Sequence, residues 1–460
     1  MLDRSSKLFG TNGVRGTFGT GLTLDFVVDL TYALASYYKN GPIVVGRDGR
    51  MSSQIISRII RSTLNSGGLD VGNADLIPTP CLQYAAKRLG YSGGIMVTAS
   101  HNPPEYNGIK VIADDGVEIP RADELEVETN YYSKKFSRID GNASDFHDHH
   151  RLIDSYLTQV EQLVDTEKIR QRKFTIVLDP GNGVQAIVAP LLTEKLGCKA
   201  ITINSNIDGR FPARGPEPTA DKLQTLSSIV RSTKADFGVA YDGDGDRSIF
   251  CDEKGQMQSG DRTAAKIVDY LLSTRHKGEE VICPINTTMA LSIVANEAGS
   301  KVVHTKVGSV EVSREMVHRK SSIGLEENGG FMYGKLNEVR DGVMTTALVL
   351  EMLASERGTF SNLISTLPKM FQYKTKFRCD HDKAKEVVEA CMDHGTFQNV
   401  ETLDGAKIWL DDETWLMVRP SGTEPLVRMY AESTDELLLD SKVREYRSLI
   451  ESTIASTKLR

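Results

Sequence analysis

Short apolar runs alternate with helix-period segments along most of this chain. The runs IMVT at 95–98 and FGVAY at 237–241 are typical of buried strands, and 53–65 has the spacing of an amphipathic helix followed by Gly67 as a stop. The helix is expected to place one apolar face inward, made of Ile55, Ile56, Ile59, Ile60 and Leu64. Such alternation favours parallel or mixed sheets covered by helices. We therefore expect an α/β fold.

The length and one change of pattern predict several domains. At about 100–200 residues per domain, 460 residues make three or four. From about residue 373 the order becomes strand, helix, three strands and a last helix, which is typical of an α+β domain. A polar stretch at 140–150 is expected to be a linker. Its three histidines (His147, His149 and His150) are interpreted as solvated, since no partner ligands lie at helical spacing nearby.

Composition excludes several classes of function. The net charge of −7 offers no basic field for nucleic-acid phosphates, so no nucleic-acid partner is expected. No apolar run approaches the roughly 18 residues of a membrane span, so no membrane partner is expected either. The cysteines are scattered without a CxxC pair, which favours reduced thiols in a cytoplasmic protein.

Three carboxylates at alternate positions follow the run FGVAY, at Asp242, Asp244 and Asp246. The glycines between them allow a tight turn, so the side chains can converge on one hard cation such as Mg²⁺. A calcium-binding EF-hand loop is an alternative, but Arg247 stands where that loop needs glycine and the flanks have strand patterns. A phosphatase with Asp242 as nucleophile and Asp244 as acid is a second alternative.

Ser100 lies in TASHNPP, at the end of a predicted buried strand, in a turn rich in Asn and Pro. A serine hydroxyl needs activation to act as a nucleophile, and a cation, His101 or Lys110 could supply it. The alternative is a helix cap and turn without chemistry.

Three further segments have weaker signals. RPSGTEP, with Arg428 beyond it, offers backbone N–H groups, hydroxyls and arginine forks to a phosphate, although a tight hairpin with surface arginines has the same pattern. Glu327 and Asn328 on the glycine loop EENGG suit sugar hydroxyls, or form a plain turn. FGTNGVRG offers Arg15 on a glycine-rich loop.

Together these motifs resemble the α-D-phosphohexomutase family, which includes phosphoglucomutases, phosphomannomutases and phosphoglucosamine mutases. FGTNGVRG, TASHNPPEYNGIK, DGDGDR, EENGG and RPSGTEP occur in the family's order over nearly the whole chain. The resemblance implies three mixed-sheet α/β domains and a C-terminal α+β domain around a central active-site cleft. The expected boundaries are 1–148, 149–250, 251–370 and 371–460.

The resemblance also implies a reaction and a set of roles. Hexose 1-phosphate and 6-phosphate would interconvert through a phosphoserine at Ser100 and a hexose 1,6-bisphosphate. One Mg²⁺ would be held by Ser100 and the three aspartates. Lys110 would act as general acid/base, with Arg15, His101 and Arg247 as counter-charges. Sugar hydroxyls would contact Glu327, Asn328 and Gly329, and the second phosphate would contact Arg419, Ser421, Gly422, Thr423 and Arg428.

The chain departs from many relatives at three positions, and these concern the sugar. Phe331 stands where many bacterial members have a histidine, Asn328 where many have serine, and Asn12 where aspartate is common. The expected activity is phosphomannomutase/phosphoglucomutase, with phosphoglucosamine mutase as the alternative. A non-catalytic sugar-phosphate binding protein is a rival of another class. The preferred sugar and the oligomeric state stay open.

Overall fold

The computed structural model describes residues 7–10, 12–134, 136, 143–422 and 425–456. It contains four sheets in chain order, each the centre of one domain. The first domain has a six-stranded mixed sheet in the order β1-β5-β4-β2-β3-β6. Its strands are β1 (Val14–Thr17), β2 (Ile43–Arg47), β3 (Val71–Leu76), β4 (Gly94–Val97), β5 (Tyr106–Ile112) and β6 (Asp145–His147). Its helices are α1 (Leu24–Tyr38), α2 (Ser53–Ser66), α3 (Thr79–Arg88) and α4 (Arg121–Ser133).

The second domain has a four-stranded sheet in the order β10-β9-β7-β8, in which only the β9–β10 pair is antiparallel. Its strands are β7 (Thr175–Asp179), β8 (Lys199–Thr202), β9 (Phe237–Tyr241) and β10 (Ser248–Asp252). Around them lie α5 (His149–Gln162), α6 (Thr166–Arg172), α7 (Gln185–Lys195), the short helix η1 (Ala220–Lys222) and α8 (Gln224–Thr233).

The third domain has a five-stranded mixed sheet in the order β12-β11-β13-β14-β15. Its strands are β11 (Val281–Pro284), β12 (Val302–Thr305), β13 (Ile323–Leu325), β14 (Phe331–Tyr333) and β15 (Asn337–Arg340). Its helices are α9 (Gly260–Thr274), α10 (Met289–Glu297), α11 (Ser309–Arg319), α12 (Gly342–Glu356) and α13 (Phe360–Ser365). One continuous apolar core joins the second and third domains to α3 of the first.

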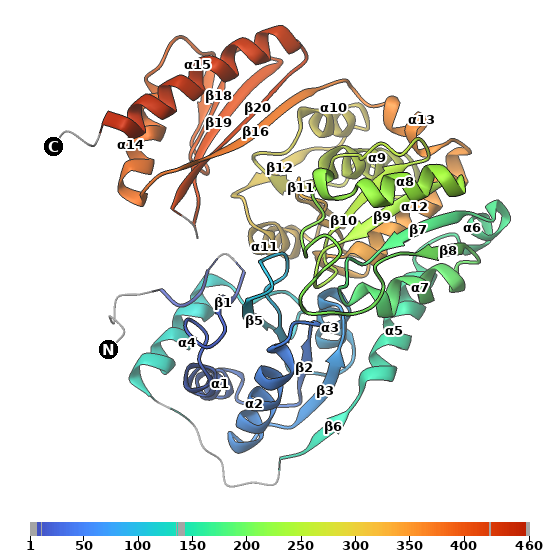
Figure 1. Ribbon diagram of the computed structural model, residues 1–460, viewed down its shortest axis with the longest axis vertical. Helices are drawn as coiled ribbons and strands as arrows, with labels where there is room; N and C mark the ends of the chain where they lie inside the picture. Colours follow the sequence, from blue (N-terminus) through green and yellow to red (C-terminus); the bar gives the residue numbers. More distant parts are fainter. Residues whose placement is uncertain (1–6, 11, 135, 137–142, 423–424, 457–460) are drawn as a thin grey trace.

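The fourth domain has an antiparallel sheet in the order β16-β20-β19-β18-β17. Its elements are β16 (Phe371–Arg378), α14 (His381–Met392), β17 (Asn399–Glu401), β18 (Ala406–Trp409), β19 (Thr414–Pro420), β20 (Leu426–Ser433) and α15 (Glu436–Ala455). The domains follow one another in an arc, with the fourth beside the third and on the same side of the molecule as the first (Figure 1).

The fourth domain packs on the third through a small apolar cluster that includes Trp415, Tyr430 and Ile285. The buried Lys407 Nζ lies over the Trp415 ring and donates a hydrogen bond to the carbonyl of Ile285 at 2.9 Å. These contacts hold the sheet of the fourth domain against the third through one face, while the other face packs on α14 and α15.

The three mixed sheets and the antiparallel C-terminal sheet confirm the predicted fold class. Two local expectations were wrong. Ile55 in α2 is 47% exposed, so the buried face of that helix is narrower than expected. Within the predicted linker, residues 145–147 form β6, which pairs in parallel with β3, and α5 begins at His149. The side chains of this three-residue edge strand, Phe146 included, are exposed and give no periodic apolar signal, although its backbone pairs with β3 along one side.

Where the structure describes the chain, no helix is both long and apolar enough to cross a membrane. All six cysteines have free thiols.

Candidate active site

The three aspartates lie in the turn between β9 and β10, and all three are buried. One carboxylate oxygen of each lies within 4.8 Å of the others. Gly245 has φ +77°, and a side chain there would meet Gln185, so the turn requires glycine. Because the loop is flanked by two antiparallel strands, the EF-hand alternative is excluded.

Ser100 follows β4, and its backbone has φ +50°. Its Oγ donates a hydrogen bond to Asp242 Oδ2 at 2.8 Å and lies 3.3 Å from His101 Nδ1. The backbone N–H of Ser100 donates to Thr98 Oγ1 at 2.9 Å. The structure therefore brings the predicted nucleophile of the first domain into direct contact with the aspartate turn of the second.

Arg50 holds the serine loop and was missed by the sequence analysis. Its guanidinium donates to four loop carbonyls, those of Ser100 (2.8 Å), Asn102 (2.7 Å), Pro103 (2.6 Å) and Tyr106 (2.9 Å). Its Nε pairs with the buried Asp48 at 3.0 Å. The available signal was the charged segment RDGR directly after a buried strand.

Lys110 links two of the aspartates. Its Nζ donates to Asp244 Oδ2 at 2.8 Å and to Asp246 Oδ2 at 3.0 Å. Burial opposes its charge, but these carboxylates outweigh burial and raise the pKa of Lys110 above its usual value. Lys110 is therefore protonated in this state and can donate a proton.

Two further residues bind the aspartates, and no motif in the sequence indicated either of them. Thr79, at the start of α3, donates its hydroxyl to Asp244 Oδ2 at 2.6 Å. Arg340, at the end of β15, donates to Asp246 Oδ2 at 2.6 Å and to Glu326 at 2.9 Å. The first and third domains thus both contact the aspartate turn of the second, from chain positions far away.

Four buried atoms of charged side chains around the turn have no hydrogen-bond partner among the described residues, although Arg247 Nε and Asp246 Oδ1 form a long ion pair at 4.0 Å. The four atoms are Asp244 Oδ1, Asp246 Oδ1, Arg15 Nε and Arg247 Nε. Unpaired buried groups of this kind are rare because they carry a desolvation cost. Two carboxylate oxygens suit a divalent cation and two guanidinium donors suit a phosphate, so the residues fit both groups.

The expected role of His101 as a counter-charge depends on whether its imidazole is protonated. The nearby Arg247 guanidinium, then burial, Arg15 and Arg340, hold the pKa of His101 well below its usual range. The imidazole is therefore neutral next to the unmodified serine, and the positive charge comes from the arginines and Lys110. Burial lowers the pKa of Arg15 to about 10, which still leaves it charged at neutral pH.

The predicted sugar loop connects β13 and β14 and lies against the aspartate turn. Ser248 N–H, at the start of β10, donates to the Gly329 carbonyl at 3.0 Å. Gly329 has φ +89°, and a side chain there would collide with Ser248. Asn328 Oδ1 has no partner among the described residues, while the Glu327 carboxylate contacts Lys374 of β16. Phe331 is buried in the core at the start of β14.

The predicted phosphate-binding residues lie at the ends of β19 and β20. Arg419 and Arg428 are directly opposite each other in the sheet, and Lys376 of β16 is opposite Arg428. Arg419 pairs with Asp404 at 3.0 Å. Ser421 is buried and Gly422 exposed, while Thr423 lies outside the described residues. Like charges in one row of a sheet repel, so this row favours an anion.

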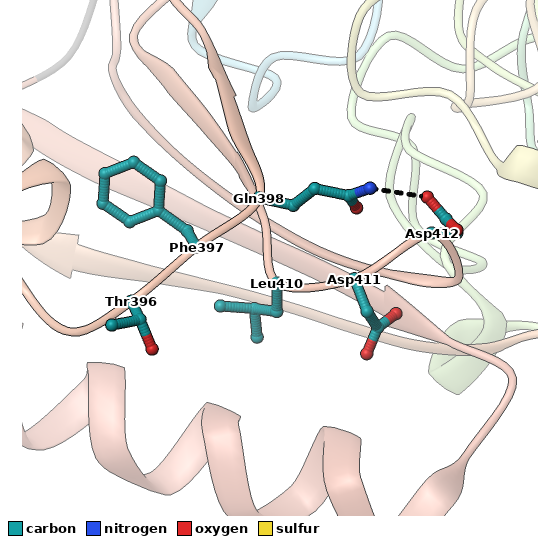
Figure 2. Close-up of a pocket in the computed structure, with 6 residues that line it drawn as sticks. All are labelled: Thr396, Phe397, Gln398, Leu410, Asp411 and Asp412. Carbon is teal, nitrogen blue, oxygen red and sulfur yellow. Dashed lines mark hydrogen bonds between the residues drawn. The ribbon is translucent and has the colours of Figure 1, made fainter.

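A separate pocket of about 330 Å³ lies at the far edge of the fourth domain (Figure 2). Its lining includes the exposed Phe397 and a hydrogen bond from Gln398 to Asp412 at 2.8 Å. None of the predicted site residues lines it.

Comparison with known proteins decides the family. The four domain models of phosphoglucomutase/phosphomannomutase match this chain in order: α/β/α domain I at residues 6–138, domain II at 154–255, domain III at 259–371 and the C-terminal domain at 375–446. The chain belongs to the phosphoglucomutase/phosphomannomutase family. It is therefore a phosphohexomutase, an isomerase of the phosphotransferase type.

Similar proteins carry two substrate names. A phosphoglucosamine/phosphogalactosamine mutase of Sulfurisphaera tokodaii is 40% identical and covers 97% of this chain and 99% of its own. A phosphoglucomutase/phosphomannomutase of Thermococcus kodakarensis is 38% identical, covering 96% and 97%. The crystal structure of a family protein from Burkholderia thailandensis has a TM-score of 0.86 at 26% identity and covers 98% of each chain.

Proposed function

We propose that this phosphohexomutase interconverts hexose 1-phosphates and 6-phosphates through a phosphoserine at Ser100 and a hexose 1,6-bisphosphate. The observation that carries the proposal is the position of Ser100 Oγ, 2.8 Å from Asp242, beside unpaired guanidinium donors and carboxylate oxygens. A phosphoryl group on Ser100 brings nearly two negative charges, and these groups supply its donors and its cation site.

The three aspartates and an oxygen of the phosphoserine would hold one Mg²⁺, since hard cations take oxygen ligands. When bound, the ion stabilises negative charge on the transferring phosphoryl group. Arg15 and Arg247, whose Nε atoms have no hydrogen-bond partner among the described residues, would serve as the remaining counter-charges.

Each half-reaction moves one phosphoryl group and one proton. A hexose 1-phosphate binds with its phosphate at Arg419 and Arg428 and its 6-hydroxyl facing Ser100. The bond from phosphorus to Ser100 Oγ breaks as the bond to the sugar oxygen forms, and the serine oxygen gains the proton that the hydroxyl loses. Lys110, protonated and bound to Asp244 and Asp246, is the proposed relay: it donates a proton to the leaving serine oxygen and takes up the proton that the sugar hydroxyl loses, and the reverse direction uses the same two transfers.

The bisphosphate then turns end for end and returns its other phosphate to Ser100. The sugar loop must accept both orientations, which favours contacts to the hydroxyls in the middle of the ring. Glu327, Asn328 and the backbone of Gly329 are the proposed sugar contacts. Glucose and mannose phosphates are the proposed substrates. Phosphoglucosamine mutase is the second candidate, supported by the 40% identical relative of that name.

Two rivals make different predictions. An aspartyl phosphatase would carry an acid-labile phosphoryl adduct on Asp242 and release inorganic phosphate from hexose 1-phosphate. A non-catalytic binding protein would bind hexose phosphates without turnover, yet it would have no use for a nucleophile beside three carboxylates.

Ser100→Ala tests the proposal. Turnover of glucose 1-phosphate with Mg²⁺ and the 1,6-bisphosphate should fall by at least about 10³-fold, because no neighbouring group replaces a covalent nucleophile. The acid-stable phosphoryl group should be absent from the peptide that contains residue 100. Ser232→Ala, an exposed hydroxyl on α8, is the control and should match the wild type. Near-normal turnover in the Ser100 variant would overturn the phosphoserine assignment.

A further inference from the structure

An ion pair between two domains contacts the proposed sugar loop. Lys374 lies on the edge strand β16 of the fourth domain, and its Nζ pairs with Glu327 Oε2 of the third. The other Glu327 oxygen has only a long contact, 3.5 Å from Asn286 Nδ2. Lys374 is therefore the principal partner of this carboxylate among the described residues.

The backbone of the sugar loop is fixed by other contacts. Ser248 N–H binds the Gly329 carbonyl, and Gly260 at the start of α9 lies so close that a side chain there would sit 2.3 Å from Gly329 N. A side chain on Gly260 would also sit 2.7 Å from the Glu327 carbonyl. What the lysine fixes is thus the direction of the Glu327 side chain rather than the path of the loop.

Lys374 is itself held in place by its strand. Gln372, two residues earlier on the same face, donates to Asp261 at 2.8 Å and to Glu432 at 2.7 Å, which anchors β16 to the third domain. The Lys374 ammonium also lies 3.9 Å from the buried Asp261 carboxylate. In the sheet, Lys374 is opposite Tyr430, two rows from the pair Lys376 and Arg428. The same strands therefore carry both the lysine and the proposed phosphate-binding row.

We propose that Lys374 is a positioning residue, which holds the Glu327 carboxylate toward the sugar and so links sugar recognition to the domain that binds the phosphate. The inference rests on the proposed function. Without the ammonium, Glu327 keeps only its long contact to Asn286, and its carboxylate is free to adopt other rotamers. A carboxylate that must be ordered on binding contributes less to affinity than one already in place.

A double-mutant cycle on the full chain tests this. The variants are Lys374→Met, Glu327→Gln and their combination, and the measurement is kcat and KM for glucose 1-phosphate. Lys374→Met should lower kcat/KM by about 10- to 100-fold, the range for one charge-assisted bond. The double variant should match Glu327→Gln within about threefold, since the lysine acts through that carboxylate. Lys374→Arg, which keeps the charge, should recover most of the loss.

Competitive inhibition by inorganic phosphate separates positioning from direct phosphate binding. The inhibition constant in Lys374→Met should stay within about twofold of wild type, because Arg419 and Arg428 are untouched. Lys385→Met is the matched control: it removes an exposed lysine from α14, which packs on the opposite face of the same sheet. Its kinetics should equal those of the wild type, and thermal unfolding should show all variants folded.

Three results would overturn the inference: wild-type kinetics in Lys374→Met, multiplicative losses in the double variant, or phosphate inhibition weakened as strongly as kcat/KM. If Lys374→Met does not fold, Lys374→Gln replaces it in the cycle. A wild-type chain without hexose phosphate turnover would instead overturn the proposed function, and this inference with it.

Discussion

Ser100 adopts a left-handed backbone conformation, which costs a non-glycine residue energy and persists only where the surroundings impose it. Here the surroundings are explicit. Arg50 donates to the Ser100 carbonyl, Thr98 accepts a hydrogen bond from the Ser100 N–H, and Asp242 accepts one from the Ser100 hydroxyl. The strained residue is thus the one that the proposed chemistry requires at a fixed position beside the aspartates.

Asp244→Asn should weaken the response to magnesium. One oxygen of Asp244 is bound by Lys110 and Thr79, and the unpaired oxygen is the one available to a cation. The amide keeps the shape but loses the charge, so kcat should fall roughly 100-fold or more while KM changes little. Titration of turnover with MgCl₂ measures this. The exposed Asp412→Asn is the control, and a change in KM alone would contradict the metal assignment.

The raised pKa of Asp341 predicts that the stability of the fold depends on pH. Burial raises the pKa of this helix-capping carboxyl to about 6, against hydrogen bonds from Tyr156 and the backbone of α12. The folded state therefore binds its proton more tightly than the unfolded state, and this contribution to stability is lost as pH rises through 6. In Asp341→Asn, which also caps helices, the free energy of unfolding relative to wild type should rise by about 2 kcal/mol between pH 4.5 and 7.5.

Denaturant unfolding of both proteins across that pH range supplies the measurement. The comparison is between variant and wild type at each pH, which removes the titration of all other groups. A difference that does not change with pH would show that Asp341 has an ordinary pKa.

At the scale of elements, the apolar periodicity of the sequence predicted the strands and helices whose side chains are buried. The runs at 95–98 and 237–241 are β4 and β9, and the amphipathic segment is α2. It missed β6, a three-residue strand whose side chains are all exposed, and it missed Arg50, Arg340 and Lys374. These side chains act through partners far away in the chain, and a pairing such as that of Lys374 with Glu327 is fixed only when two domains are placed together.

The row of cations across β16, β20 and β19 gives a prediction of its own. Arg428→Ala should raise KM for glucose 1-phosphate by about 10- to 100-fold, because it removes a charge-assisted bond to the phosphate that does not react. Inhibition by inorganic phosphate should weaken in parallel, unlike the result expected for Lys374→Met. Lys385→Met again serves as the control. If glucose and glucose 1-phosphate competed equally well in the wild type, this row would not be a phosphate site.

At the scale of the whole molecule, the proposed site draws on all four domains. The first supplies Ser100 and Lys110, the second the aspartate turn, the third the sugar loop and Arg340, and the fourth Lys374 and the arginine row. Direct contacts tie these parts together, such as that of Ser100 with Asp242 and that of Ser248 with Gly329. In the proposed function, the sugar would therefore be contacted by a few side chains on a loop that binds Ser248 of the second domain and Lys374 of the fourth.

This arrangement predicts breadth for the sugar: glucose 1-phosphate and mannose 1-phosphate should react with comparable kcat/KM, and glucosamine 1-phosphate should be a third substrate. We propose that Glu327 and Asn328 contact the 3- and 4-hydroxyls, which have the same configuration in all three sugars. Phe331, which stands where many relatives have a histidine, is buried in the core and offers the loop no donor.

The comparison of kcat/KM should include 2-deoxyglucose 1-phosphate, which lacks the group at carbon 2 and should stay within about tenfold of glucose 1-phosphate, since an unread group contributes little. The bisphosphate strengthens the argument because it binds in two orientations, and a tight contact to carbon 2 in one orientation would be misplaced in the other. A site that hydrogen-bonds a distinguishing group discriminates by roughly 10⁴–10⁵-fold. A preference above about 10³-fold for one of the three sugars would therefore reveal a residue that reads carbon 2, and the expectation of breadth would be wrong.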